Sequence, residues 1–347
     1  MGEITCPVPL GDGGRILLAH GGGGRLTRDL VERIFVPAFR NDTLAALHDA
    51  AVLERPSAAL AFTTDSFVVR PLFFPGGDVG KLAVTGTVND LAMSGARPLY
   101  LSLGFILEEG LAVADLQRVV ASIQAAAQEA GVAVVAGDTK VVERGKGDGI
   151  FITSSGIGVV EAPHPVAPSE VRPGDAVLVS GPVGQHGVAV MAVRDDLAFA
   201  SPIVSDCASV AGPVLALLAA GLRMHCLRDP TRGGVATVLN EIAAQAHCEI
   251  VVHESAIPVG EDVVGACEVL GLDPLYVACE GRFLAFVPAG DADRALALLR
   301  SRPETAQAAR IGTVREGGTP ALVVLRTRAG GERVLDLLSG EQLPRIC

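Results

Sequence analysis

The chain has 347 residues, of which 49% are hydrophobic, and its net charge is −11 at pH 7. This length suggests about two domains, and the acidic balance without a basic block argues against nucleic acid as a partner. No apolar run approaches the roughly 20 residues needed to cross a bilayer, and the N-terminus has no signal-peptide layout. We therefore expect a cytoplasmic protein without a membrane partner. The 41 glycines indicate an α/β fold with many tight turns.

The first half of the chain alternates between predicted helices and strands. The segments are a helix over 26–35, two strands within 58–74 around a turn at Asp65, a helix within 78–98, a strand over 100–107, a helix over 113–131, and strands over 132–142 and 149–160. The helix over 113–131 is the clearest, because its apolar residues recur at helical spacing and Gly131 follows them.

A Pro-rich polar segment, 161–175, is the best candidate for a domain boundary. A second α/β unit follows it. Its predicted elements are strands over 176–181, 282–289 and 321–327, and a helix over 231–247 with a glycine-rich entrance. The last nine residues, 339–347, show no periodic pattern and are predicted to form a tail.

Acidic residues stand in Gly- or Thr-rich contexts near the ends of apolar segments. They are Asp49, Asp65, Asp90, Asp138 and Asp229. Ligand sites gather at strand ends in α/β folds, and carboxylates on loops suit Mg²⁺, which usually arrives with substrate phosphates. The alternative is that these residues are helix caps and turn residues, which aspartate also favours.

Three further residues carry candidate chemistry. The string "PGGDVGKL" around Lys81 resembles a P-loop, but Pro75 and Leu82 stand where that motif needs Gly and Ser or Thr. Lys81 can still meet a phosphate as a point charge. Lys140 in "GDTK" and Glu280 in "ACEGRF" are candidates for acid–base work, with a surface charge as the alternative for each.

The seven cysteines are odd in number and form no CxxC pair, which argues against a disulfide framework and a zinc site. Cys347 is the last residue. A thiolate there is a strong nucleophile that a second protein can reach. The nine tail residues span at most roughly 30 Å, enough to enter a cleft of the same chain. Taken alone, a terminal cysteine is more simply an accident of sequence.

In combination, several motifs identify a family. The strings "TTDSFVVRPLFFPGGDVGKLAVTGTVNDLAMSGA", "GDTKVVE" and "DPTRGGVATVLNE" and the terminal "PRIC" resemble the hydrogenase maturation factors HypE, the carbamoyl dehydratases. These belong to an ATP-binding superfamily with aminoimidazole ribonucleotide synthetase and selenophosphate synthetase. The resemblance implies a two-domain PurM-like α/β (α+β) fold.

The resemblance also implies a domain layout. Residues 1–15 would be an N-terminal extension expected to be disordered. Residues 16–160 would bind ATP and dimerise through their sheet. Residues 171–338 would form the C-terminal α/β sandwich domain, and residues 339–347 a mobile tail.

The reaction implied by the resemblance begins on Cys347. A carbamoyltransferase, HypF, places a carboxamide on its thiol. ATP-dependent dehydration converts this thiocarboxamide to a thiocyanate. The cyano group then passes to iron on a HypC–HypD complex, as a ligand for [NiFe] hydrogenase. The resemblance further implies a homodimer and Mg²⁺ with the ATP.

By the same resemblance, residues of the matching motifs receive roles. Asp49, Asp65, Asp90 and Asp229 are predicted at the metal, and Asp65, Lys81, Thr87, Asn89, Asp90, Asp138 and Thr139 at the nucleotide. Glu280 is predicted as the base and Lys140 as the electrostatic stabiliser near Cys347. The family string "ANEGK" reads "ACEGR" here, so Cys279 and Arg282 put the hydrogen bonding beside Glu280 in question.

Two other functions stay open from the residues alone. The first is a kinase or synthetase of the same superfamily that acts on a free small molecule. The second is a maturation scaffold without catalysis, whose Cys347 holds a metal or a partner.

Overall fold

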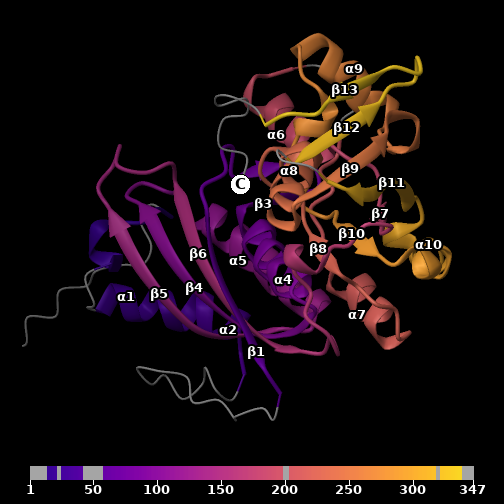
Figure 1. Ribbon diagram of the computed structural model, residues 1–347. Helices are drawn as coiled ribbons and strands as arrows, with labels where there is room; N and C mark the ends of the chain where they lie inside the picture. The colour runs from indigo at the N-terminus through magenta and orange to yellow at the C-terminus, as the bar shows by residue number, and fades with distance from the viewer. Residues whose placement is uncertain (1–13, 22–24, 42–57, 198–202, 318–320, 338–347) are drawn as a thin grey trace, which may run out of the picture.

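The computed structural model describes residues 14–21, 25–41, 58–197, 203–317 and 321–337 (Figure 1). The first half of the chain builds a four-stranded sheet of order β1-β6-β4-β5. Its strands are β1 (Leu60–Phe67), β4 (Ala96–Glu108), β5 (Ala133–Val142) and β6 (Ile150–Val160). β4 runs parallel to β5, whereas β6 is antiparallel to both β1 and β4.

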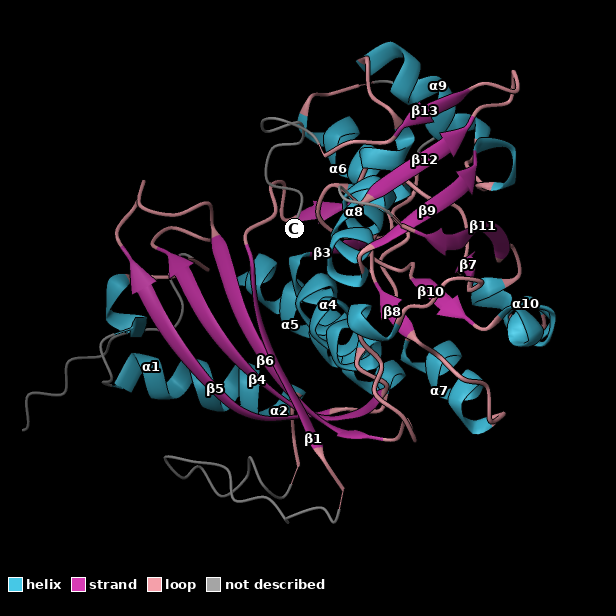
Figure 2. Ribbon diagram, viewed as in Figure 1, coloured by secondary structure: helices cyan, strands magenta, loops and turns pink. Residues whose placement is uncertain are grey.

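Helices pack against one face of this sheet (Figure 2). They are α1 (Arg25–Leu30), the π-helical η2 (Val31–Phe35), α2 (Val36–Ala38), α4 (Val79–Met93) and α5 (Val113–Ala130), with a small hairpin of β2 (Phe73–Phe74) and β3 (Gly77–Asp78) before α4. Asp78 caps α4, because its carboxylate accepts hydrogen bonds from the N–H groups of Gly80 and Lys81 at 2.8 and 3.0 Å. Gly131 ends α5 in a left-handed conformation, as predicted.

The two faces of the sheet differ. Successive strand residues point to opposite faces, and on β1 the buried Phe67 and the Asp90-bonded Thr63 point toward α4. We call this the inner face. On the outer face Phe62 is 70% exposed, Leu60 55% and Ile106 41%. Among the described elements, no helix covers that outer face (Figure 2).

The second half of the chain forms a seven-stranded sheet of order β13-β12-β9-β11-β7-β10-β8. The strands are β7 (Ala176–Val179), β8 (Cys226–Arg228), β9 (Cys248–His253), β10 (Leu284–Val287), β11 (Ala309–Glu316), β12 (Leu322–Arg326) and β13 (Glu332–Val334). The helices are α6 (Gln185–Arg194), α7 (Ala211–Ala219), α8 (Gly234–Ala246), α9 (Glu261–Leu270) and α10 (Ala292–Arg300). Alternate residues of β7 join different apolar clusters, so α8 packs on one face and α7 with α10 on the other.

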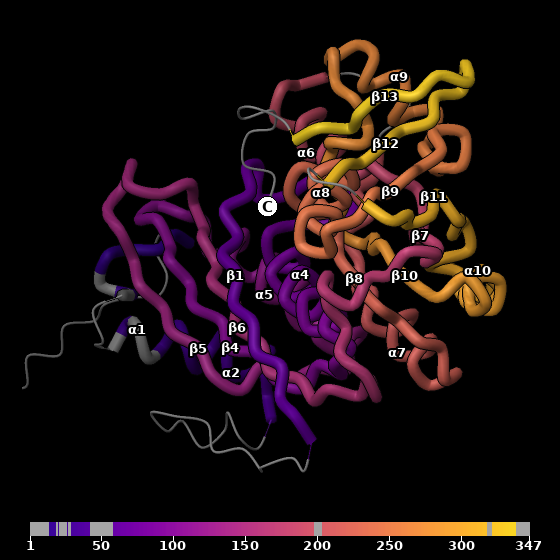
Figure 3. The backbone as a smooth tube through the Cα atoms, viewed as in Figure 1, coloured from indigo at the N-terminus to yellow at the C-terminus, as the bar shows by residue number. Residues whose placement is uncertain are grey.

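One apolar cluster runs from the inner face of the first sheet, through α4 and α5, to α7 and α10. Helix α4 is therefore buried nearly all round, between the first sheet and the second domain (Figures 1 and 3). In the part of the chain that the structure describes, no helix is long and apolar enough to span a membrane.

Candidate functional site

Three of the predicted aspartates come together where α4 meets β1 and β8. Asp65 lies on β1, Asp90 on α4, and Asp229 directly after β8. Thr63 Oγ1 donates a hydrogen bond to Asp90 Oδ2 at 2.9 Å. Arg232 Nη2, from the loop that leads into α8, donates to Asp65 Oδ1 at 3.0 Å. The site thus draws on both domains.

The charges of these aspartates act on one another. Burial, reinforced by the charges of Asp90 and Asp65, raises the pKa of Asp229 to about 7. Burial raises the pKa of Asp90 as well, with Asp65 adding to the shift and the Thr63 hydrogen bond opposing it. Carboxylates that repel one another in this way favour either a shared proton or a bound cation.

The local structure around the predicted aspartates agrees with the prediction except at Asp65. Asp138 lies inside β5 and Asp90 inside α4, within the segments predicted as a strand and a helix, whereas Asp65 lies inside β1. The turn predicted at Asp65 is wrong, because β1 is an edge strand whose alternating exposure admits a polar side chain. Asp229 does follow a strand, as predicted.

Glu280 joins this group from the loop before β10. Its side chain is buried, and its Oε1 has no hydrogen-bond partner. Burial raises its pKa well above the ordinary value, and four neighbouring carboxylates add to the shift. We call these five residues the acidic cluster: Asp65, Asp90, Asp206, Asp229 and Glu280. A buried carboxylate with a raised pKa and a free oxygen has the properties of a general base.

Sequence reasoning missed Asp206. Its Oδ1 accepts a hydrogen bond from the Glu280 N–H at 3.1 Å, and its Oδ2 lies 3.7 Å from Arg282 Nε. The signal in the sequence was an aspartate in the short non-periodic stretch "SDCAS" before α7. Nothing local distinguishes such a residue from a turn aspartate.

The two departures from the family string form specific contacts. Arg282 donates from Nε to the Pro182 carbonyl at 2.9 Å and from Nη2 to Gln185 Oε1 at 3.2 Å. Cys279 is fully buried, and its Sγ accepts a hydrogen bond from the Gly184 N–H at 3.2 Å. Burial raises the pKa of its thiol well above the ordinary value, so Cys279 serves here as a packing residue.

Lys140 and Asp138 lie on the other side of the first sheet. Asp138 pairs with Gly104 and Lys140 with Ile106 across β4 and β5, so both belong to the outer face. Lys140 Nζ bonds Asp138 Oδ1 at 3.0 Å, both side chains are about two-thirds exposed, and this hydrogen bond lowers the pKa of Asp138. Thr139 points the opposite way. Within one chain, the structure does not bring Lys140 to Glu280.

Besides Asp90, three predicted nucleotide residues lie on α4, and they differ in their surroundings. Thr87 is fully buried, and its hydroxyl donates to the Ala83 carbonyl at 3.0 Å, so its position is that of a packing residue. Lys81 Nζ is exposed and bonds the Gly76 carbonyl at 3.0 Å. Asn89 is buried and bonds the second domain. Asp49 and Cys347 lie outside the described residues.

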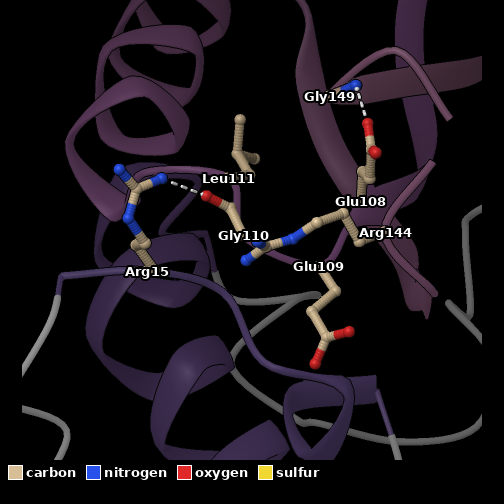
Figure 4. Close-up of a pocket in the computed structure, with 7 residues that line it drawn as sticks. All are labelled: Arg15, Glu108, Glu109, Gly110, Leu111, Arg144 and Gly149. Atoms are coloured by element: carbon tan, nitrogen blue, oxygen red, sulfur yellow. Dashed lines mark hydrogen bonds between the residues drawn. The ribbon is translucent and has the colours of Figure 1, made fainter.

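A pocket of about 520 Å³ opens elsewhere, at the ends of β4 and β5 (Figure 4). Arg15, Glu108, Glu109 and Arg144 supply its charged lining. Glu108 accepts a hydrogen bond from the Gly149 N–H at 3.0 Å. None of the predicted site residues lines this pocket, so we do not assign it to the acidic cluster.

Comparison with known proteins identifies the family. Models of AIR synthase related proteins match the chain twice, the N-terminal domain at residues 47–160 and the C-terminal domain at residues 172–325. Carbamoyl dehydratase HypE of Cupriavidus necator is 53% identical over 335 residues, which cover 96% of this chain and 95% of that protein. The chain belongs to the HypE family, the carbamoyl dehydratases.

Crystal structures of HypE proteins have the same fold. A HypE in complex with ATP is 50% identical, with a TM-score of 0.92 over 95% of this chain and 99% of that one. A HypE–HypF complex contains a chain that is 46% identical, with a TM-score of 0.78 over 90% of this chain and 99% of that one. The predictions of the HypE family, the two-domain PurM-like fold and a carbamoyl dehydratase enzyme are confirmed.

Proposed function

We propose that this protein uses ATP to dehydrate a thiocarboxamide on Cys347 to a thiocyanate, the precursor of the cyanide ligand of hydrogenase iron. The observation that carries the proposal is the buried Glu280, with its unpartnered Oε1, beside four aspartates. A HypE relative of 50% identity binds ATP, which supports ATP as the co-substrate. We assign ATP to residues 16–160, the completion of the cleft to residues 171–338, and the carrier role to residues 339–347.

The chemistry follows from the poor leaving ability of an amide oxygen. The carboxamide oxygen attacks the γ-phosphorus of ATP, so that a C–O–P linkage forms and ADP departs. Glu280 then takes a proton from the carboxamide nitrogen. The C–O bond breaks, the oxygen leaves with inorganic phosphate, and the nitrogen lone pair completes the C≡N bond. The other N–H proton is released to water when the C–O–P linkage forms, so both amide protons and the oxygen leave and the nitrile remains.

The aspartates fit a cation that is shared with phosphates. Among the described residues, no group of three or more His, Cys, Asp or Glu is arranged to hold a metal alone. Mg²⁺ usually takes only one or two carboxylates and completes its shell with phosphate oxygens and water. We propose Asp65, Asp90 and Asp229 for this role, with Asp49 as a further candidate. Bound there, Mg²⁺ would screen the triphosphate charge.

The remaining residues predicted at the nucleotide lie at different places in the fold, and their proposed roles differ accordingly. We propose Lys81 as a phosphate contact, because its half-buried side chain carries an ammonium group to the surface at the start of α4. Asp138, Thr139 and Lys140 stay as proposals for the nucleotide and the carboxamide. Because Asp138 and Lys140 lie on the outer face, we propose that a second protein surface completes their site.

We propose that a second copy of the chain is that surface. The outer face presents Leu60, Phe62 and Ile106, large apolar side chains that favour burial. A homodimer formed through this face would cover Lys140 and Asp138. In the same proposal, HypF loads Cys347, as a HypE–HypF complex of a relative supports, and a HypC–HypD complex accepts the cyano group. A reduced Cys347 thiol requires a reducing compartment, so we place the protein in the cytoplasm.

The experiment follows one thiol through two steps. The full-length protein is loaded with HypF, carbamoyl phosphate and ATP, freed of nucleotide, and then given ATP or a non-hydrolysable analogue. We expect the C-terminal peptide to carry a carboxamide on Cys347 after loading. It should lose one water when ATP is added but not when the analogue is added, as mass spectrometry measures.

Cys347→Ser is the matched control, because it replaces only the sulfur atom, and it should block loading. If Cys347→Ala still formed an ATP-dependent product from a free small molecule, the superfamily kinase or synthetase would be correct. If the bare thiol bound metal and ATP had no effect on the loaded peptide, the scaffold would be correct.

A further inference from the structure

Asn89 connects the two domains through its side-chain amide. Nδ2 donates hydrogen bonds to the Glu280 carbonyl at 3.1 Å and to the Ala208 carbonyl at 3.0 Å. Oδ1 accepts a hydrogen bond from the Val210 N–H at 2.8 Å. Asn89 is 1% exposed, so all three bonds form away from water. Both donors of the amide are occupied by the backbone of the second domain.

Two side chains therefore bond the backbone of Glu280, one at its carbonyl and one at its N–H. Asn89 binds its carbonyl, and Asp206 Oδ1 accepts from its N–H at 3.1 Å. The next residue fixes the loop further, because a Cβ added to Gly281 would lie 1.9 Å from the Asp206 carbonyl oxygen. A side chain at position 281 would push the loop away from Asp206. Glu280 thus stands in a loop whose position depends on these few contacts.

The neighbour of Asn89 faces the other half of the site. Asp90 follows it on α4 and bonds Thr63 of β1, and consecutive helical residues point about 100° apart. One turn of α4 therefore carries a proposed metal-and-nucleotide residue and the residue that holds the loop of Glu280. Because α4 is rigid, a movement of the helix at Asp90 also moves Asn89.

We propose that Asn89 is a positioning residue for the dehydration step, which sets the Glu280 carboxylate from across the domain interface. This inference rests on the proposed function of Glu280 as the base. It replaces the predicted contact between Asn89 and the nucleotide, since neither amide donor is left for a phosphate. Asn89 acts on the reaction only through Glu280, and ATP binding should depend on it little.

The test separates the rate of dehydration from the binding of ATP. In the loaded full-length protein, Asn89→Ala should slow the loss of water from the Cys347 carboxamide roughly 10²-fold, as a small misplacement of a catalytic group does. The KM for ATP and the extent of loading by HypF should stay near the wild-type values. Asn240→Ala is the matched control, because Asn240 Nδ2 also donates to two carbonyls, Ala236 and Leu335, but within the second domain.

Asn89→Asp covers the case in which the alanine variant fails to fold. It keeps the side-chain shape and the acceptor for the Val210 N–H, but it loses both donors, so we expect the same slow dehydration at an unchanged KM for ATP. Dehydration at the wild-type rate in Asn89→Asp would overturn the inference. An equal loss of the dehydration rate in Asn240→Ala would also overturn it. So would a slow rate that excess ATP brings back to the wild-type value.

Glu280→Gln distinguishes failure of this inference from failure of the proposed function. If Glu280→Gln dehydrates the loaded carboxamide normally, Glu280 is not the base, and both proposals fall. If Glu280→Gln stalls after loading while both Asn89 variants turn over normally, only the positioning role of Asn89 is wrong.

Discussion

At the scale of single residues, Asp229 shows how the gathered carboxylates affect stability. Its pKa rises from 3.8 to about 7 because it is buried beside Asp90 and Asp65. Between these two values the folded chain binds a proton that the unfolded chain has lost. The free energy of unfolding therefore falls as the pH rises through this window, by at most about 1.4 kcal/mol per pH unit from one group, and falls no further above it.

Asp229→Asn should flatten this pH dependence. Urea unfolding in the absence of nucleotide, at several pH values between 4 and 7, should show a smaller loss of stability in the variant than in the wild type. Some slope should remain, because the pKa values of Asp90 and Glu280 are also raised. Asp293→Asn, at an exposed position of α10, is the control. Equal slopes in Asp229→Asn and wild type would show that ionisation of Asp229 does not cause the loss of stability with rising pH.

At the scale of elements, α4 is the part of the fold on which the site depends. It carries Asp90 toward β1 and Asn89 toward the second domain, and it packs closely against α5. A Cβ added to Gly80 of α4 would lie 2.5 Å from the Val119 carbonyl oxygen of α5. The absence of a side chain at Gly80 thus sets how near the two helices approach, and with it the position of α4.

Gly80→Ala should destabilise the protein by about 1–3 kcal/mol, because the new methyl group overpacks the contact between α4 and α5. Gly265→Ala on α9 is the opposite case, since nothing lies within 4 Å of its added Cβ. There the gain in helix propensity should stabilise the chain by up to about 1 kcal/mol. Chemical denaturation of both variants measures the difference, and equal effects would contradict the close α4–α5 packing.

At the scale of the whole molecule, the open outer face should determine the oligomeric state. Phe62→Asp places a charge in the middle of the apolar side chains of that face and should shift the protein from dimer to monomer. Val269→Asp is the control, because Val269 is 78% exposed on α9 of the second domain. Sedimentation velocity at several protein concentrations reports the result. If both variants sediment like the wild type, the outer face is not the contact between copies.

Motifs and periodic helices could be predicted without coordinates. The helix over 113–131 and its end at Gly131 appear as predicted, because an amphipathic face and a left-handed glycine are local properties. Asp65, Asp90 and Asp229, which the motifs predicted at one site, do lie close together. The resemblance of those motifs was specific enough to indicate the family.

Only the tertiary structure decided which residues share a surface. The alternation of a strand separates its two faces but does not say which face the helices cover, so Lys140 and Asp138 could not be placed apart from Asp90 by sequence alone. Asn89 and Asp206 acquire their roles from contacts with Glu280, from which they are separated by 191 and 74 residues along the chain. The sequence determined which chemical groups are present, and long-range packing determined which of them meet.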